Sequence, residues 1–213
     1  MNIERKLALA IGARRSIRRY RQEPIERKTI ERLLLAATRA PSPHNRQPWR
    51  FAVVEDDLSK RELAQAMGER LRADRKADGD DMTAIDADVA RSHARIEGAA
   101  VVIVVCIDME GMDRYPDSRR IHAEYLMTVQ SAAMAAQNLL LAAHSEGLGA
   151  CIMCAPLFCP DTVAGTLKLA RGWTPQMLLT LGMPSDAGRD RPRTALNEIV
   201  QWLPRSAVAP WEC

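Results

Sequence analysis

The segment His122–His144, HAEYLMTVQSAAMAAQNLLLAAH, constrains the fold more than any other part of the chain. It contains no glycine or proline, and it carries alanine, leucine and methionine on nearly every side of a helix. A helix that is apolar nearly all round is buried in the middle of a structure. The rest of the chain must therefore pack around this helix, which Gly147 and Gly149 bring to an end.

The remaining segments alternate between helical and strand-like patterns. The run Gly98–Ile107, GAAVVIVVCI, has the length of a buried strand. Three further strands are expected at WRFAVVE, at Ala150–Cys154 and at QMLLTLGMP, and DMEGMDRYPDSRR is expected to be a loop. Helices are expected at the N-terminus with Ile3, Leu7 and Ile11 on one face, around Ile30–Ala37, over Asp57–Arg75, over about Ala84–Ile96 and near Asp161–Leu169. This order predicts one α/β or α+β domain over residues 1–213.

Composition sets the class of protein. The chain has 213 residues, of which 47% are hydrophobic, and this is enough to form the core of one domain. No apolar run approaches the roughly 20 residues that a membrane span needs. The N-terminus lacks the small-residue cleavage site of an export signal. We therefore expect a cytoplasmic protein without a membrane partner.

The five cysteines of the chain are expected to be reduced, because their number is odd and no export signal precedes them. Cys151 and Cys154 form one C-x-x-C pair, but no second close pair of Cys or His supplies the two further ligands that zinc needs. On a strand, residues three apart point to opposite faces. We therefore expect no metal site.

The stretch ARRSIRRY, residues 13–20, contains four arginines, and Arg21 follows it. A nucleic-acid grip is disfavoured, because acidic residues balance the basic ones elsewhere and no aromatic stacking platform accompanies the run. A solvated charged face is the simplest alternative. Alternation around Ile17 favours a third possibility, in which one set of side chains packs against the core and the other lines a pocket.

Such a pocket would suit an oxyanion such as phosphate. Arginine offers forked donors, and the Ser16 hydroxyl adds one more. A second basic group, Arg189, Arg191 and Arg193, follows the last core strand and could close the same pocket.

The motifs RRSIRRY and APSPHNRQPW, followed by a strand, resemble the N-terminal signature of the nitroreductase family of FMN-dependent oxidoreductases. AAQNLLLAAHSEGLGAC and RPRTALNEIV are similar to the central helix and the basic C-terminal stretch of that family. The resemblance covers Ala8 to about Val200 and is weakest over Ser59–Ile96. It implies an α+β three-layer sandwich with a central, mainly antiparallel mixed sheet. It also implies a homodimer with the long core helix at its interface.

The resemblance also implies a set of site residues. The phosphate and ribityl chain of FMN would be held by Arg14, Arg15, Ser16, Arg18, Arg191 and Arg193. The flavin ring would be lined by Pro41, Ser42 and Asn45 from the partner subunit, with Gln47 assisting that loop. The strand residues Gly149, Cys151 and Met153 would pass beside the ring. No ionisable catalytic residue is required, because the cofactor carries the chemistry.

Within the family, the segment from Asp113 to Val163 is most similar to the flavin reductase domain of the bifunctional enzyme of coenzyme F-420 biosynthesis. This likeness implies a deazaflavin precursor as the planar acceptor, with Asp74 facing it. His44 is a second candidate for contact with the substrate. Three functions stay open: this reductase, a general NAD(P)H-dependent nitro or quinone reductase, and a non-catalytic flavin-binding protein.

Overall fold

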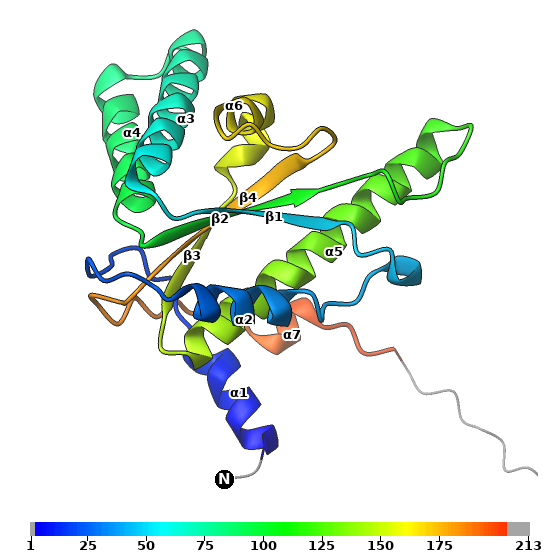
Figure 1. The fold of residues 1–213 in the computed structure, drawn as a ribbon. Coiled ribbons are helices and arrows are strands. Elements are labelled where there is room, and N and C mark those ends of the chain that lie inside the picture. The colour runs from blue at the N-terminus through cyan, green and yellow to red at the C-terminus, as the bar shows by residue number, and fades with distance from the viewer. Residues whose placement is uncertain (1–2, 204–213) are drawn as a thin grey trace, which may run out of the picture.

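The structure, a computed structural model, describes residues 3–203. Its four strands form one sheet in the order β1-β2-β4-β3, in which all neighbours are antiparallel (Figure 1). The central register places Val104 of β2 opposite Ala52 of β1 and Leu178 of β4. The strands are β1 (Trp49–Val54), β2 (Val101–Ile107), β3 (Gly149–Met153) and β4 (Thr174–Gly182).

Strand β2 lies inside the sheet because both of its faces are apolar. Val101, Ile103, Val105 and Ile107 pack into one core cluster, and Val102, Val104 and Cys106 pack into the other. The first cluster is covered by α2 (Arg27–Ala37) and α5 (Ser118–Ser145), and the second by α3 (Asp57–Ala77), α4 (Met82–Glu97) and α6 (Pro160–Thr166). The expected three-layer α+β arrangement is confirmed, and its sheet is antiparallel throughout.

Four short or peripheral elements complete the described chain. They are α1 (Ile3–Ala13), the 3₁₀ turns η1 (Pro43–Asn45) and η2 (Ala155–Phe158), and α7 (Leu196–Ile199). Helix α1 projects from the body of the molecule (Figure 1). Its residues Leu7 and Ile11, which were expected to share one face, remain 58% and 54% exposed.

Helix α5 begins four residues earlier than the apolar pattern suggested, so the prediction of a loop over Ser118–Arg120 was wrong. The cause is a helix cap. The side chain of Asp117 accepts a hydrogen bond from the backbone N–H of Arg120 at 2.9 Å, which satisfies a donor that the first turn leaves free. This capping also keeps the pKa of the Asp117 carboxyl below its usual range.

The apolar character of α5 is only partly explained by the core. By length and composition alone it could cross a membrane, but its face with Thr128, Ala132 and Leu139 is fully buried within the fold. On the opposite face Leu126 and Met134 are exposed. The apolar residues of α5 therefore form two surfaces, one inside the protein and one outside.

The arginine-rich segment after α1 is fastened to the end of the sheet. Ser16 bridges to Ala150 of β3, and the N–H of Ile17 donates to the Ala150 carbonyl at 3.0 Å. Further on, the N–H of Arg21 donates to the carbonyl of Met183 at 2.8 Å. Between these points the Ile17 and Tyr20 side chains enter the second core cluster.

Glycines make room for these two side chains. A Cβ on Gly149 would lie 2.7 Å from Cγ2 of Ile17, and a Cβ on Gly182 would lie 2.7 Å from Cβ of Tyr20. Neither distance is tolerated between real atoms, so the segment could not approach the sheet if these residues were larger. The turn at the C-terminal end of α5 is made by Gly147, which has φ +77°, and not by Gly149.

Replacing Gly149 with alanine should therefore displace Ile17. We expect Gly149→Ala to lower the free energy of unfolding by about 1–3 kcal/mol, the usual cost of overpacking. Gly165→Ala is the matched control, because an added Cβ there meets nothing within 4 Å and a helical alanine adds up to about 1 kcal/mol of stability. Urea denaturation compares the two variants. Equal midpoints would show that the close approach is unimportant.

Candidate functional site

The segment from Arg14 to Tyr20 divides its side chains between core and solvent. Ile17 and Tyr20 are buried, whereas Arg18 and Arg19 are exposed. The Tyr20 hydroxyl lies 2.7 Å from the Ile17 carbonyl oxygen and 2.8 Å from the Thr180 hydroxyl. Burial raises the pKa of Tyr20, while the contact with Thr180 opposes the shift. The phenol is therefore a neutral anchor that fixes the direction of its neighbours.

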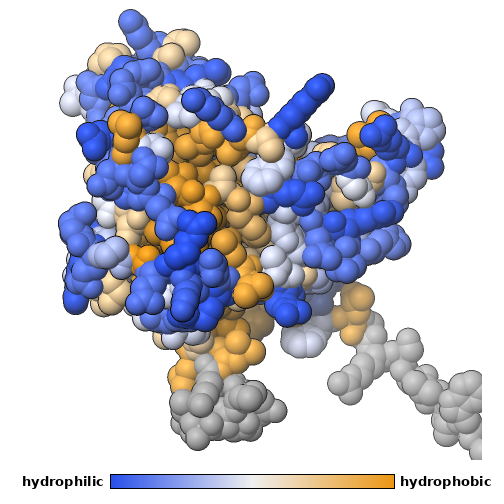
Figure 2. Space-filling model, in the orientation of Figure 1, coloured by the Kyte–Doolittle hydropathy of each residue, from blue (hydrophilic) through white to orange (hydrophobic). Residues whose placement is uncertain are grey.

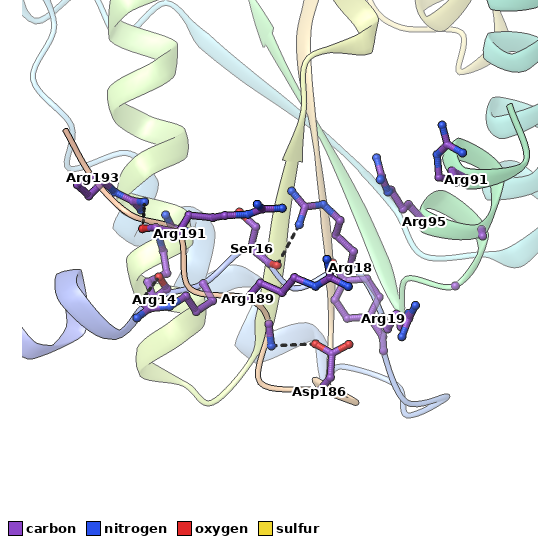
Figure 3. Close-up of a pocket in the computed structure, with 15 residues that line it drawn as sticks. Arg14, Ser16, Arg18, Arg19, Arg91, Arg95, Asp186, Arg189, Arg191 and Arg193 are labelled. Atoms are coloured by element: carbon purple, nitrogen blue, oxygen red, sulfur yellow. Dashed lines mark hydrogen bonds between the residues drawn. The ribbon is translucent and has the colours of Figure 1, made fainter. Parts of the chain in front are cut away.

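The neighbouring side chains line a cavity of about 1100 Å³ (Figure 3). Its walls come from three parts of the chain: the segment after α1, the C-terminal half of α4, and the loop after β4. Nine arginines line it, namely Arg14, Arg15, Arg18, Arg19, Arg91, Arg95, Arg189, Arg191 and Arg193. The expectation that the two basic clusters share one pocket is thus met by the geometry.

Few carboxylates balance this charge. Arg15 pairs with Asp190 at 2.9 Å, which ties the two clusters together, and Arg91 pairs with Asp88. Within residues 3–203 the other seven guanidiniums of the cavity form no ion pair, although Asp186 also lies in its wall. Arginine stays charged at any physiological pH and offers forked donors. The cavity is therefore suited to a phosphate or another oxyanion.

Sequence reasoning missed Arg91 and Arg95 as members of this site. They stand four residues apart on α4, so they share one face of that helix. The only signal in the sequence was this spacing, which is also common on solvated helices. Their proximity to the first segment depends on how α4 packs, and the sequence does not reveal that.

None of the three expected strand residues lines the arginine cavity, although Cys151 lies near the charges of three of its arginines. Gly149, Cys151 and Met153 are buried on one face of β3, on the side of Ile17. Burial raises the pKa of the Cys151 thiol, and the nearby charges of Arg18, Arg95 and Arg14 oppose this. Cys151 is buried on β3, whereas Cys154 follows the end of that strand and is exposed. The strand expected over Ala150–Cys154 thus ends one residue earlier, and the two thiols lie in different environments. The four described cysteines are free, and Cys213 lies outside the described residues.

The loop with Pro41, Ser42, His44, Asn45 and Gln47 has an unusual backbone. His44, Asn45 and Gln47 have φ values of 47°, 54° and 50°, a region that non-glycine residues rarely adopt. The Gln47 N–H donates to the Ser42 hydroxyl at 3.0 Å and helps to hold this shape. Strain of this kind is often found at functional sites.

None of these loop residues lines the arginine cavity of the same chain. Figure 1 shows η1 at the opposite end of the sheet from the segment after α1. Within one chain, the structure therefore does not bring the two predicted halves of the site together.

Asp74 also lies away from the cavity walls. Its carboxylate forms an ion pair with Arg70, one turn earlier on α3, at 2.8 Å. Three other arginines outside the cavity walls are likewise paired: Arg46 with Asp113 at 2.6 Å, Arg72 with Asp86 at 2.8 Å, and Arg75 with Asp80 at 2.6 Å.

Comparison with known proteins supports the family assignment. A curated relative from Thermus thermophilus, named NADH dehydrogenase, is 30% identical over 89% of this chain and 92% of its own length. A Desulfovibrio desulfuricans structure in complex with FMN has a TM-score of 0.71 and 27% identity, covering 96% of this chain and 99% of that one. The Vibrio harveyi NADPH:FMN oxidoreductase complexed with NAD⁺ shares the fold, with a TM-score of 0.70 and 23% identity over 95% of this chain and 79% of that one.

The family profile described as "Nitroreductase family" matches residues 11–183. That range includes the first arginine cluster, the strained loop, all four strands and the long helix α5. Together with the Thermus relative, this match shows that the chain belongs to the nitroreductase family.

Proposed function

We propose that the protein is an FMN-dependent oxidoreductase that passes electrons from NAD(P)H to a small planar acceptor. The observation that carries this is the arginine cavity, whose seven unpaired guanidiniums within the described chain match the phosphate of a mononucleotide. A relative of the same fold binds FMN. A cytoplasmic location, expected from the sequence, remains part of the proposal.

The residues present fit the phosphate end of the cofactor. Arg14 and Arg18 flank Ser16 on the segment that is fastened to β3, so their positions are set by the sheet. Arg191 and Arg193 approach from the loop after β4. Arg15 has a different role, because its guanidinium already contacts Asp190 and the Gly12 carbonyl. It holds the two clusters together instead of facing the ligand alone.

The chemistry that bound FMN supplies is two-electron transfer between a reductant and an acceptor. The protein contributes anchoring and exclusion of water. Arginines would fix one end of the ligand, and the buried Gly149 of the edge strand β3 packs against Ile17 of the arginine segment. The raised pKa of Cys151 keeps its thiol protonated, so it does not act as a nucleophile.

A second copy of the chain would complete the site. The strained loop contributes no residue to the arginine cavity of its own chain, and η1 lies at the opposite end of the sheet from the segment after α1 (Figure 1). Large apolar side chains are exposed on α1, α2, α5 and α7. Figure 2 shows apolar surface gathered in the middle of one face and continuing onto α1. Exposed apolar surface on this scale marks an interface. We propose a homodimer in which each loop reaches the flavin of its partner.

For the acceptor, we propose a dehydro precursor of a deazaflavin coenzyme. This finer assignment rests on the resemblance over Asp113–Val163, a segment that contains most of α5 and all of β3. A general nitro or quinone reductase is the alternative, because the family name itself refers to nitro compounds.

The cofactor assignment predicts the effect of removing two cavity charges. Arg14→Gln combined with Arg18→Gln should lose most of its flavin on gel filtration, because each charge-assisted contact to phosphate contributes about 1.5–3 kcal/mol. The control removes the same charge at two exposed arginines outside the cavity, Arg61→Gln and Arg171→Gln. The ratio of flavin to protein is read from the absorption spectrum. A fully yellow cavity variant would refute the assignment.

The dimer assignment predicts the effect of charges on α5. Leu126→Glu with Met134→Glu places four carboxylates in a two-fold interface, where burial of unpaired charge is costly. Sedimentation should show a mass falling from about twice 23.7 kDa to 23.7 kDa. Met82→Glu, at an exposed position on α4, should leave the dimer intact. A parent protein that is already a flavin-loaded monomer would contradict the proposal.

The acceptor assignment is tested by calorimetry on the FMN-loaded protein. Titration with the deazaflavin coenzyme should give measurable heat and a lower Kd than titration with a nitroarene, because a broad planar ligand buries more surface. Absence of deazaflavin binding, together with fast NAD(P)H-driven reduction of nitroarenes, would favour the general reductase.

A further inference from the structure

The cavity holds more positive charge than one flavin phosphate can balance. A phosphate monoester carries about −1.5 to −2 charges near neutral pH. Seven guanidiniums of the cavity have no ion-pair partner within residues 3–203. Like charges at such density repel one another, so a second anion would be favoured in the same cavity.

The arginines are divided between two ends of the cavity. In Figure 3 Arg14, Arg191 and Arg193 lie at one end, and Arg91 and Arg95 lie at the other. Because a projection can only shorten the distance between two groups, the arginines at the two ends are also separated in space. The volume of about 1100 Å³ slightly exceeds the usual range for small-ligand sites, which is about 300–1,000 Å³. The α4 end is kept open by Ala94 and Gly98, which also line it.

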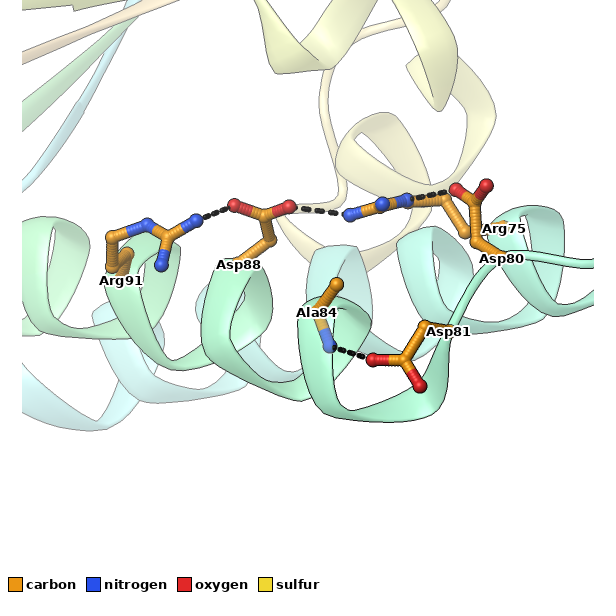
Figure 4. Close-up of polar contacts among 6 residues, drawn as sticks. All are labelled: Arg75, Asp80, Asp81, Ala84, Asp88 and Arg91. Atoms are coloured by element: carbon orange, nitrogen blue, oxygen red, sulfur yellow. Dashed lines mark hydrogen bonds and ion pairs between the residues drawn. The ribbon is translucent and has the colours of Figure 1, made fainter.

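Arg91 is held in place by a series of ion pairs along the α3–α4 arm. Asp88 contacts both Arg91 and Arg75, and Arg75 also contacts Asp80 at 2.6 Å (Figure 4). These arginines lower the pKa of Asp88, so the carboxylate stays ionised. Asp88 is thus shared between two cations and neutralises neither fully.

Arg95 has no such partner among the described residues. It stands one turn after Arg91, and like charges at this spacing destabilise a helix. The C-terminal end of α4 offsets part of this charge, since a helix end is equivalent to about half an elementary charge. The two guanidiniums still leave a net positive site that faces the cavity.

Resting on the proposed function, we propose that Arg91 and Arg95 form a second phosphate subsite that receives the 2′-phosphate of NADPH. Forked guanidiniums match the oxygens of a phosphate monoester. The ribose of NADH carries only a neutral hydroxyl there, so it would leave Arg95 uncompensated and Arg91 compensated only by the Asp88 that it shares with Arg75. This subsite makes NADPH the preferred reductant and sets the specificity of the cavity.

Calorimetry with two nucleotide probes tests the subsite without relying on catalysis. 2′,5′-ADP carries the 2′-phosphate, and 5′-AMP lacks it. The FMN-loaded protein should bind 2′,5′-ADP at least about ten-fold more tightly, as expected for charge-assisted contacts. Arg91→Gln with Arg95→Gln should abolish this preference and keep its flavin. The control variant with Arg61→Gln and Arg171→Gln should retain both the preference for 2′,5′-ADP and the bound flavin.

Two outcomes would overturn the proposal. One is equal binding of the two probes by the parent protein. The other is loss of FMN from the Arg91 and Arg95 double variant, which would place these residues in the cofactor site. A parent protein without flavin would instead refute the proposed function. In that case the same two probes, titrated into the flavin-free protein, still decide whether the subsite exists.

Discussion

The docking of Ile17 and Tyr20 against the end of the sheet is the contact on which the candidate site depends. Three glycines permit it: Gly149 and Gly182 in the strands, and Gly188, where an added Cβ would lie 2.8 Å from Cδ1 of Ile17. While these two side chains are buried, Arg18 and Arg19 between them are exposed, and Arg14 and Ser16 on the N-terminal side line the cavity. The packing of Ile17 and Tyr20 in the core thus determines where the neighbouring arginine side chains lie on the surface.

The charges themselves oppose folding, because like charges gathered around one cavity repel each other. The Arg15–Asp190 pair and the buried Tyr20 hydroxyl resist this repulsion from two sides. The ion pair is weak alone, since Asp190 is 77% exposed and a pair so open to water contributes little. The rigid sheet behind the segment provides most of the support. Anion binding is then favoured because it relieves the repulsion.

The sequence was most informative where the pattern was local. The apolar run of β2 and the long helix α5 each reflect contacts that neighbouring residues share. The segment after α1 is divided between core and cavity as predicted, but its buried side chains, Ile17 and Tyr20, are three residues apart and do not alternate. The strand order β1-β2-β4-β3 was not predictable, because it depends on pairing between distant segments. The start of α5 at Ser118 depended on one capping aspartate that the apolar pattern could not show. Arg91 and Arg95 line the cavity because of the way α4 packs, and the residues next to them in the sequence do not predict that packing.

The choice of arginine for every cation of the cavity has a chemical consequence. Only five of the 30 basic residues in the chain are lysines, at positions 6, 28, 60, 76 and 168, and none of the four whose side chains the structure describes, 28, 60, 76 and 168, lines the cavity. Acetylation, which removes the charge of lysine, therefore leaves the charge of this cavity untouched. Reactive dicarbonyl compounds, which condense with guanidinium groups, would instead find nine potential targets around one opening. Lysine acetylation would therefore not change the charge of the cavity, whereas dicarbonyl modification of arginine would reduce it.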